Sequence, residues 1–205
     1  MYVRRTLLAA VLSLFLPGPL FAAHRPLLIC YGDSITAGYG LPYGQSYPDD
    51  LQRKLNALGY RYTVRNMGVS GATTKDAAAN LPSVLGLHPA IVIVEFGGND
   101  GLRGLPLTQT RENLDMVLTA LQAAHIKVLL AGITLPPNYG QDYIGSFDRL
   151  FRTLAAQHHV AFVPMLYENL VNVSGTIQAD GIHPTAKGSR LIAEMLLPVL
   201  KPLMR

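Results

Sequence analysis

The sequence contains a single cysteine, Cys30, no tryptophan, and few charged residues for its length of 205 residues. One cysteine excludes an internal disulfide framework and a structural zinc site built on several thiolates. Charged residues make up 15% of the chain and hydrophobic residues 49%. This composition is too apolar for a disordered chain and suffices for the packed core of one domain of ordinary size.

Positive charge is sparse as well. Arg4 and Arg5 lie in an N-terminal leader, and subtracting these two from the 17 basic residues leaves 15 against 13 acidic ones, a net charge of +2. No dense run of lysine or arginine remains, which argues against a protein that binds the phosphate backbone of nucleic acids.

Residues 1–23 have the layout of a secretory signal peptide: two arginines, an apolar stretch over 6–16, a Pro-Gly-Pro break and two alanines. The apolar stretch is about half of the ~20 residues that a membrane-spanning helix needs. We therefore expect the leader to be cleaved and a single domain to follow over 24–205. The exact cleavage position is not predicted, because the residue at −3 would be Leu20 or Phe21, where signal peptides have a small residue. Export without a possible internal disulfide predicts a bacterial periplasmic or secreted protein.

Five short apolar runs alternate with longer stretches of helical period. The runs cover residues 27–31, 62–66, 90–96, 127–133 and 160–163. Two of them are continuously apolar, which is typical of parallel strands covered on both faces. The pattern predicts a three-layer α/β/α sandwich with a mainly parallel five-stranded sheet. Cys30 is expected to be a buried strand thiol, because the large Ile29 before it does not fit a lipoprotein site.

Four of the intervening stretches have apolar residues on one helical face, and we interpret these residues as core. The first begins at Ser46, a candidate N-cap, and ends at Gly59. The four apolar faces are Leu51, Leu55 and Leu58; Leu114, Val117, Leu118 and Leu121; Phe147, Leu150, Phe151 and Leu154; and Leu191, Ile192, Met195, Leu196 and Val199.

Polar, glycine-rich segments follow the first three predicted strands, and a fourth precedes the last helix. They are Gly32-Asp33-Ser34, Gly68-Val69-Ser70-Gly71, Gly97-Gly98-Asn99-Asp100 and Ala179-Asp180-Gly181-Ile182-His183-Pro184. The carboxyl ends of parallel strands share one edge of the sheet, where ligands of such folds bind. These loops therefore predict an active site assembled from distant parts of the chain.

Ser34 and His183 form the candidate catalytic centre. Ser34 opens a predicted helix, where an isolated serine is more often an ordinary N-cap. His183 lies three residues after Asp180, so the carboxylate can hold one ring nitrogen while the other takes a proton from Ser34. The other histidines have no acidic partner at such a spacing, and we interpret them as structural or surface residues: His24, His88, His125, His158 and His159.

Acyl transfer also needs hydrogen-bond donors for an oxyanion. Gly71 can present its backbone N–H without an obstructing side chain, and Asn99 can offer a neutral amide. Each residue alone is equally compatible with an ordinary turn. Their combination with Ser34, Asp180 and His183 favours the catalytic interpretation.

These four segments, in this order, strongly resemble the SGNH hydrolase family, also called GDSL-type esterases. The matching residues are Gly32-Asp33-Ser34-Ile35 with Gly38-Tyr39-Gly40, Gly71, Gly97-Gly98-Asn99-Asp100, and Asp180-Gly181-Ile182-His183. The resemblance covers nearly the whole mature chain and implies a flavodoxin-like α/β/α fold. It also implies that Ser34 is the nucleophile, His183 the general base and then acid, and Asp180 its orienting partner. The implied oxyanion hole is formed by Ser34, Gly71 and Asn99.

Longer stretches at 95–104, 135–140 and 178–184 look like the periplasmic thioesterase/lysophospholipase/arylesterase subgroup. This resemblance implies a serine esterase that hydrolyses carboxylic esters and acyl thioesters through an acyl-serine intermediate, without a cofactor. Lysophospholipids are further candidate substrates. The second block departs from the subgroup, which commonly has Ser-Gly-Asp-Thr where this chain has alanine at position 72. The lost side chain could soften the loop or alter substrate choice.

Several features leave alternatives open. Five residues on or beside the active-edge loops either line an acyl groove or anchor the loops: Leu102, Leu105, Pro136, Pro137 and Tyr139. A carbohydrate O-deacetylase of the same family and a non-catalytic envelope-binding protein remain as competing functions.

Other functions are disfavoured. The glycine spacing after the first strand excludes a dinucleotide-binding loop. No paired-histidine spacing supports a metal site. We expect a monomer that acts on small molecules, with no nucleic-acid partner and no membrane span after the leader is removed.

Overall fold

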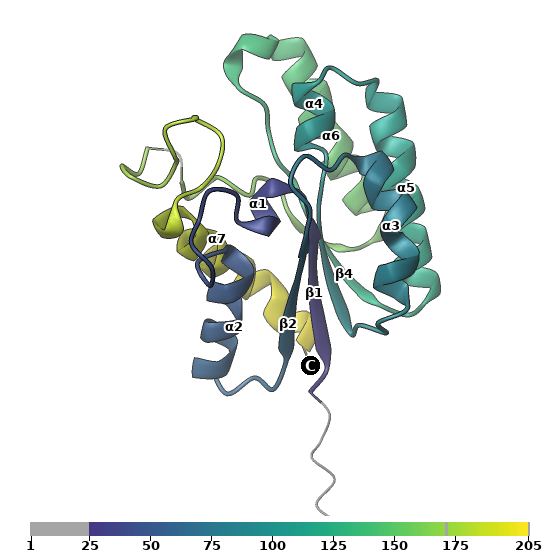
Figure 1. Cartoon of the computed structure of the whole chain (residues 1–205). Coiled ribbons are helices and arrows are strands. Elements are labelled where there is room, and N and C mark those ends of the chain that lie inside the picture. The colour runs from purple at the N-terminus through teal and green to yellow at the C-terminus, as the bar shows by residue number, and fades with distance from the viewer. Residues whose placement is uncertain (1–24, 171, 205) are drawn as a thin grey trace, which may run out of the picture.

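The computed structural model describes residues 25–170 and 172–204, so the predicted signal peptide lies outside the described residues. Five parallel strands form one sheet in the order β2-β1-β3-β4-β5 (Figure 1). Their bounds are Leu27–Gly32 (β1), Thr63–Gly68 (β2), Ile91–Glu95 (β3), Lys127–Ala131 (β4) and Ala161–Val163 (β5). Each predicted strand is present, with ends that move by no more than two residues.

Helices cover both faces of this sheet. They are α1 (Ser34–Ala37), α2 (Tyr47–Ala57), α3 (Thr74–Leu85), α4 (Gly98–Leu102), α5 (Leu107–Ala123), α6 (Gln141–His158) and α7 (Ala186–Leu200), with 3₁₀ turns at Pro137–Tyr139 and Lys201–Met204. Helices α2 and α7 pack together on one face, and α3, α5 and α6 cover the other (Figure 1). The three-layer α/β/α prediction is confirmed.

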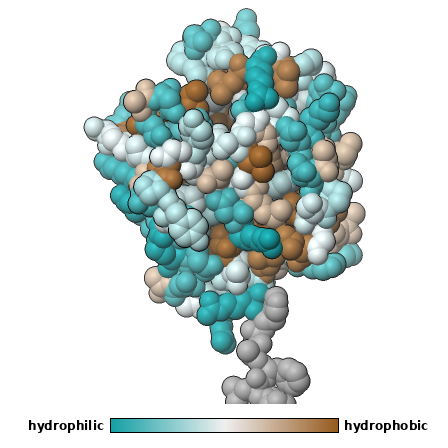
Figure 2. Space-filling model, in the orientation of Figure 1, coloured by the Kyte–Doolittle hydropathy of each residue, from teal (hydrophilic) through white to brown (hydrophobic). Residues whose placement is uncertain are grey.

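The core lies on both sides of the central strands. All five residues of β3 are buried, as the continuous apolar run predicts, and Cys30 is a fully buried thiol in β1. Burial raises the pKa of this thiol far above its ordinary value. On the face of the molecule seen in Figure 2, hydrophobic residues are interspersed with hydrophilic ones.

The predicted helix faces are core with one exception. Leu51 and Leu55 are fully buried, whereas Leu58 is half exposed because it lies after the last residue of α2, at the C-cap. Gly59 then takes a positive φ of 79°, in agreement with its predicted place at the helix end.

Sequence patterning did not predict two helices, α3 and α4. Helix α3 is rich in alanine and carries Pro82 in its last turn, so its apolar stripe is weak. Helix α4 is only five residues long and contains two glycines, a composition typical of a turn. Among the described residues, no helix is long and apolar enough to cross a membrane.

The sheet topology brings the polar segments to one edge. Gly32 at the end of β1 pairs with Gly68 of β2 on one side and with Glu95 of β3 on the other. Helix α1 begins two residues after β1, and α4 begins three residues after β3. The first residues of both helices therefore lie at the carboxyl edge of the sheet.

Candidate active site

Ser34 is the first residue of α1. Asp33 caps this helix, since its Oδ1 accepts a hydrogen bond from the Ile35 N–H at 3.0 Å. Gly38 ends the helix with a positive φ of 80°. The short helix thus places the Ser34 hydroxyl at the sheet edge with first-turn N–H groups beside it.

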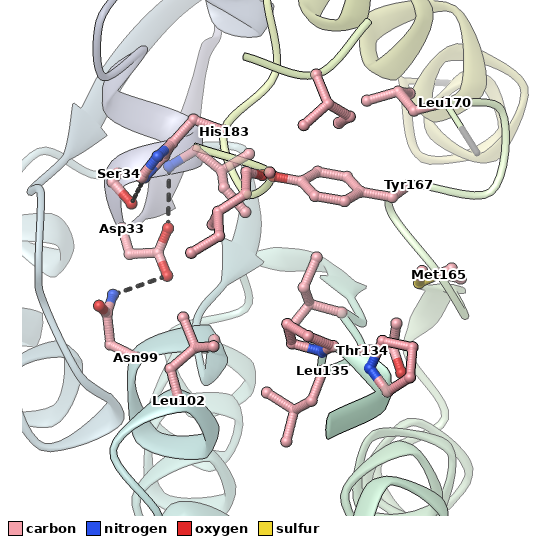
Figure 3. Close-up of a pocket in the computed structure, with 18 residues that line it drawn as sticks. Asp33, Ser34, Asn99, Leu102, Thr134, Leu135, Met165, Tyr167, Leu170 and His183 are labelled. Atoms are coloured by element: carbon pink, nitrogen blue, oxygen red, sulfur yellow. Dashed lines mark hydrogen bonds between the residues drawn. The ribbon is translucent and has the colours of Figure 1, made fainter. Parts of the chain in front are cut away.

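The structure brings Ser34, His183 and Asp180 together, and Figure 3 shows Ser34 beside His183. His183 Nε2 lies 2.9 Å from Ser34 Oγ, and His183 Nδ1 lies 2.7 Å from Asp180 Oδ2. The other carboxylate oxygen of Asp180 accepts the backbone N–H groups of Ile182 and His183 at 2.9 and 3.0 Å. Desolvation opposes ionisation, but these hydrogen bonds and that of the imidazole lower the pKa of Asp180 to about 2. A charged Asp180 accepts a hydrogen bond from the Nδ1–H group, which leaves Nε2 free to accept the hydroxyl proton of Ser34.

Tyr39 and Gln178 also contact the His183 loop, and sequence reasoning missed both roles. The Tyr39 ring packs on the His183 imidazole with centroids 4.6 Å apart. Gln178 Nε2 donates to the backbone oxygens of Tyr39 and Pro184 at 2.8 and 2.9 Å. Gln178 therefore ties the loop after α1 to the loop that carries His183. Tyr39 and Gln178 both lie in segments that match the family, but their spacing in the sequence does not indicate that they contact each other or His183.

Asn99 contacts the loop that carries Gly71 through the backbone oxygen of Ala72. Asn99 Nδ2 donates to the backbone oxygen of Ala72 at 2.9 Å and to Asp33 Oδ2 at 3.1 Å. Gly71 has a positive φ of 81°, a conformation that favours glycine, and its backbone oxygen accepts from Arg103 at 2.9 Å. Both amide hydrogens of Asn99 are thus engaged, so an oxyanion has to replace or share one of the two acceptors.

The loop after Gly71 is fixed at the start of α3. Thr73 and Asp76 form a capping box, in which the Asp76 carboxylate accepts the backbone N–H and hydroxyl of Thr73 at 2.8 and 2.7 Å. These hydrogen bonds lower the pKa of Asp76. The loop therefore has a defined anchor next to Ala72, whose own side chain makes no polar contact.

Asp33 contacts a second carboxyl group that sequence reasoning did not single out, that of Glu95. The two residues are 2% and 1% exposed. Glu95 Oε2 accepts the Asp33 N–H at 3.3 Å and the Thr36 hydroxyl at 2.8 Å. Burial raises the pKa of Asp33 to about 6 and that of Glu95 well above its ordinary value.

A cavity of about 470 Å³ opens beside Ser34 and His183 (Figure 3). Of the five candidate groove residues, Leu102, Pro136 and Pro137 line it, whereas Leu105 and Tyr139 do not. Tyr139 instead anchors the loop, since its hydroxyl donates to the Leu102 backbone oxygen at 2.7 Å. Most of the remaining lining is also apolar and includes Ile133, Leu135, Met165, Tyr167, Leu170, Ile177 and Ile182.

Two other polar residues have structural contacts. Asp100 accepts hydrogen bonds from Thr74 and Thr110, which joins α4 to α3 and α5. His158, for which spacing suggested no partner, lies 2.7 Å from Asp115 Oδ1 through its Nε2. Asp115 precedes it by 43 residues, so only tertiary packing reveals the pair. No cluster of three or more potential metal ligands occurs within 25–170 and 172–204.

Comparison with known proteins identifies the family and several relatives. The model of the GDSL-like Lipase/Acylhydrolase family matches residues 30–191. Esterase TesA of Pseudomonas aeruginosa is 42% identical over 203 residues, which is 98% of this chain and all of that protein. Thioesterase 1/protease 1/lysophospholipase L1 of Escherichia coli K12 is 36% identical over 183 residues, 89% of this chain and 86% of that one.

A solved structure is similar as well. The crystal structure of TesA has a TM-score of 0.83 at 44% identity and covers 86% of this chain and 99% of its own. The fold, the family match and the full-length relatives agree. The chain belongs to the GDSL-like lipase/acylhydrolase family, the SGNH hydrolases, and is a carboxylic-ester hydrolase.

Proposed function

We propose that this protein hydrolyses carboxylic esters and acyl thioesters through an acyl-serine intermediate on Ser34. His183 Nε2 accepts the hydroxyl proton as Ser34 Oγ attacks the carbonyl carbon, and then protonates the departing alcohol or thiol. Water attacks the acyl-serine, with its proton passing to His183 and then to Ser34 Oγ, which releases the acid. The distance of 2.9 Å between Ser34 Oγ and His183 Nε2 is the observation that carries this proposal.

The negative oxygen of the tetrahedral intermediate needs a set of fixed donors. We assign this role to the backbone N–H groups of Ser34 and Gly71 and to the side-chain amide of Asn99. Asn99 donates its amide hydrogens to Asp33 and Ala72. The longer bond, to Asp33, is the one that the oxyanion replaces in this scheme.

The cavity supports an apolar acyl group as the bound part of the substrate. A volume of about 470 Å³ is in the range of small-molecule sites. Aryl esters, acyl thioesters and lysophospholipids all present an acyl carbonyl next to an apolar group. We propose further that the protein is exported to the periplasm or secreted, and that it acts as a monomer without a cofactor.

The test is an ester-hydrolysis assay on protein purified after expression of the full chain. The substrates are p-nitrophenyl esters from acetate to palmitate, beside an acyl-CoA, and the matched variant is Ser34→Ala. We expect Ser34→Ala to lower kcat by about 10⁴- to 10⁶-fold, as loss of a triad nucleophile does, with unchanged circular dichroism. The dependence on chain length measures how much of the cavity the acyl group fills.

Two outcomes would contradict the proposal. Full activity in folded Ser34→Ala would exclude this nucleophile. A folded wild-type protein that hydrolyses none of the substrates would return attention to carbohydrate deacetylation or to non-catalytic binding. Labelling of Ser34 by a serine-directed phosphonate separates these last two, because only an enzyme with an activated serine reacts.

A further inference from the structure

Glu95 is a buried titratable group that the proposed mechanism does not use. It is the last residue of β3, is 1% exposed, and packs under the start of α1. Its Oε2 accepts from Asp33 and Thr36, whereas its Oε1 is buried without a conventional hydrogen-bond partner. A buried unpartnered oxygen is costly, so its protonation state needs an explanation.

The neighbouring groups show where a proton belongs. Asp33 already accepts hydrogen bonds from the Ile35 N–H and the Asn99 amide, which favour its ionised form against the opposing effect of burial on its pKa. Two buried carboxylates in contact cannot both be ionised at low cost. Both oxygens of Asp33 accept hydrogen bonds, whereas Oε1 of the slightly less exposed Glu95 accepts none, so the proton of the pair belongs on Glu95 Oε1.

Within residues 25–170 and 172–204, Glu95 forms no ion pair with a cationic side chain, so no paired cation holds it in its charged form. Above it, the Thr36 hydroxyl bridges at 2.9 Å to the buried Tyr47 hydroxyl of α2. Cys30 of β1 and Tyr167, on the loop after β5, are the other titratable groups near enough for the Glu95 charge to raise their pKa values. His183, which gains positive charge in the proposed mechanism, favours the ionised form of Asp33.

The location of this proton bears on Asn99. A doubly charged Asp33–Glu95 pair would place two negative charges beside the developing oxyanion, and Asp33 would compete strongly for the Asn99 amide. With the proton shared, the pair carries one charge, and Asp33 keeps a donor when Asn99 turns to the oxyanion.

We propose that Glu95 is a positioning residue that keeps a proton at neutral pH and donates a hydrogen bond to Asp33, so that the Asn99 amide is available to the oxyanion. The effect on Asn99 rests on the proposed function of Ser34 and Asn99. The protonation of Glu95 does not, because a buried neutral carboxyl group is observable without turnover.

Infrared spectroscopy tests the structural part. Wild-type protein at neutral pH should show the carbonyl stretching band of a protonated carboxylic acid. We expect this band to be lost in Glu95→Gln and retained in Asp33→Asn. A wild-type protein without the band, or a band lost in Asp33→Asn and retained in Glu95→Gln, would overturn the assignment even if catalysis follows the proposed course.

Kinetics test the functional part. Glu95→Leu removes the donor at similar volume, and we expect kcat to fall about tenfold at unchanged KM, less than the 10²–10³-fold that loss of an oxyanion donor itself costs. Glu95→Gln restores a neutral donor and should recover most of this loss.

Wild-type kcat should also decline at alkaline pH as the pair loses its proton, and this decline should be absent in Glu95→Gln. Equal kcat in the two variants would refute the positioning role, while inactivity of wild type would refute the proposed function instead.

Discussion

At the scale of single residues, His183 is supported from two sides. Asp180 fixes one ring nitrogen, and the face of Tyr39 covers the ring at a centroid distance of 4.6 Å. In the proposed mechanism His183 becomes an imidazolium when it accepts the Ser34 proton, and an aromatic ring stabilises a nearby cation. Tyr39 is half exposed, so this contact acts at the rim of the site and not in the core.

We therefore expect Tyr39→Leu to lower kcat about two- to fivefold, which corresponds to the ~0.5–1 kcal/mol of an exposed cation–π contact. Tyr39→Phe keeps the ring and should retain wild-type kcat. Steady-state kinetics on one p-nitrophenyl ester measure both variants. Equal losses in the two would show that the hydroxyl group, and not the ring face, is what matters.

At the scale of elements, short helices fix the loops of the site. Helix α1 presents Ser34, α4 presents Asn99, and the start of α3 holds the loop that carries Gly71. Gly97 at the start of α4 shows how closely these parts fit: its φ is 115°, and a Cβ there would lie 2.9 Å from the Phe151 ring. The capping box of Thr73 and Asp76 fixes the start of α3 and does not depend on a polar side chain at Ala72.

Removing this cap tests its contribution. We expect Thr73→Ala to lower the free energy of unfolding by about 1 kcal/mol, as the loss of an N-cap hydroxyl does. Thr73→Ser retains the hydroxyl and should lie close to wild type. Urea denaturation followed by circular dichroism measures the difference, and an unchanged midpoint in Thr73→Ala would show that the box does not stabilise the fold.

At the scale of the whole molecule, the buried carboxyl pair sets a pH dependence of stability. The pKa of Asp33 is raised from about 3.9 in an unfolded chain to about 6 in the fold, and that of Glu95 is raised as well. The folded state therefore binds more protons than the unfolded state above about pH 4, so stability falls as the pH rises through this range. Asp180 and Asp76 have lowered pKa values, and their contributions are lost only below about pH 4.

The melting temperature should accordingly rise when the pH is lowered from 7 to 5 at constant ionic strength. In Glu95→Gln the rise should be smaller, because one of the two raised groups no longer titrates. Differential scanning calorimetry measures both proteins. A melting temperature that falls over this interval in wild type would contradict the raised pKa values of the pair.

Much of the fold was predictable because its signals are local. Continuous apolar runs such as that of β3 mark strands covered on both faces, and the stripe of Phe147, Leu150, Phe151 and Leu154 marks a helix face whichever partner it meets. Helices α3 and α4 were missed because alanine, proline and glycine leave no such stripe. Their ends are defined by caps and by tertiary packing, since Asp100 of α4 holds Thr74 of α3.

The sequence by itself determined the layered fold, the family and the candidate triad residues, because apolar runs, helical stripes and short motifs are local signals. Only the tertiary structure decided which groups surround that triad. Tyr39 and His183, Asp33 and Glu95, and Asp115 and His158 are pairs separated by 43 to 144 residues, and no periodicity connects them. Whether a carboxyl group holds a proton depends on the water and charges around it, and those are fixed by packing.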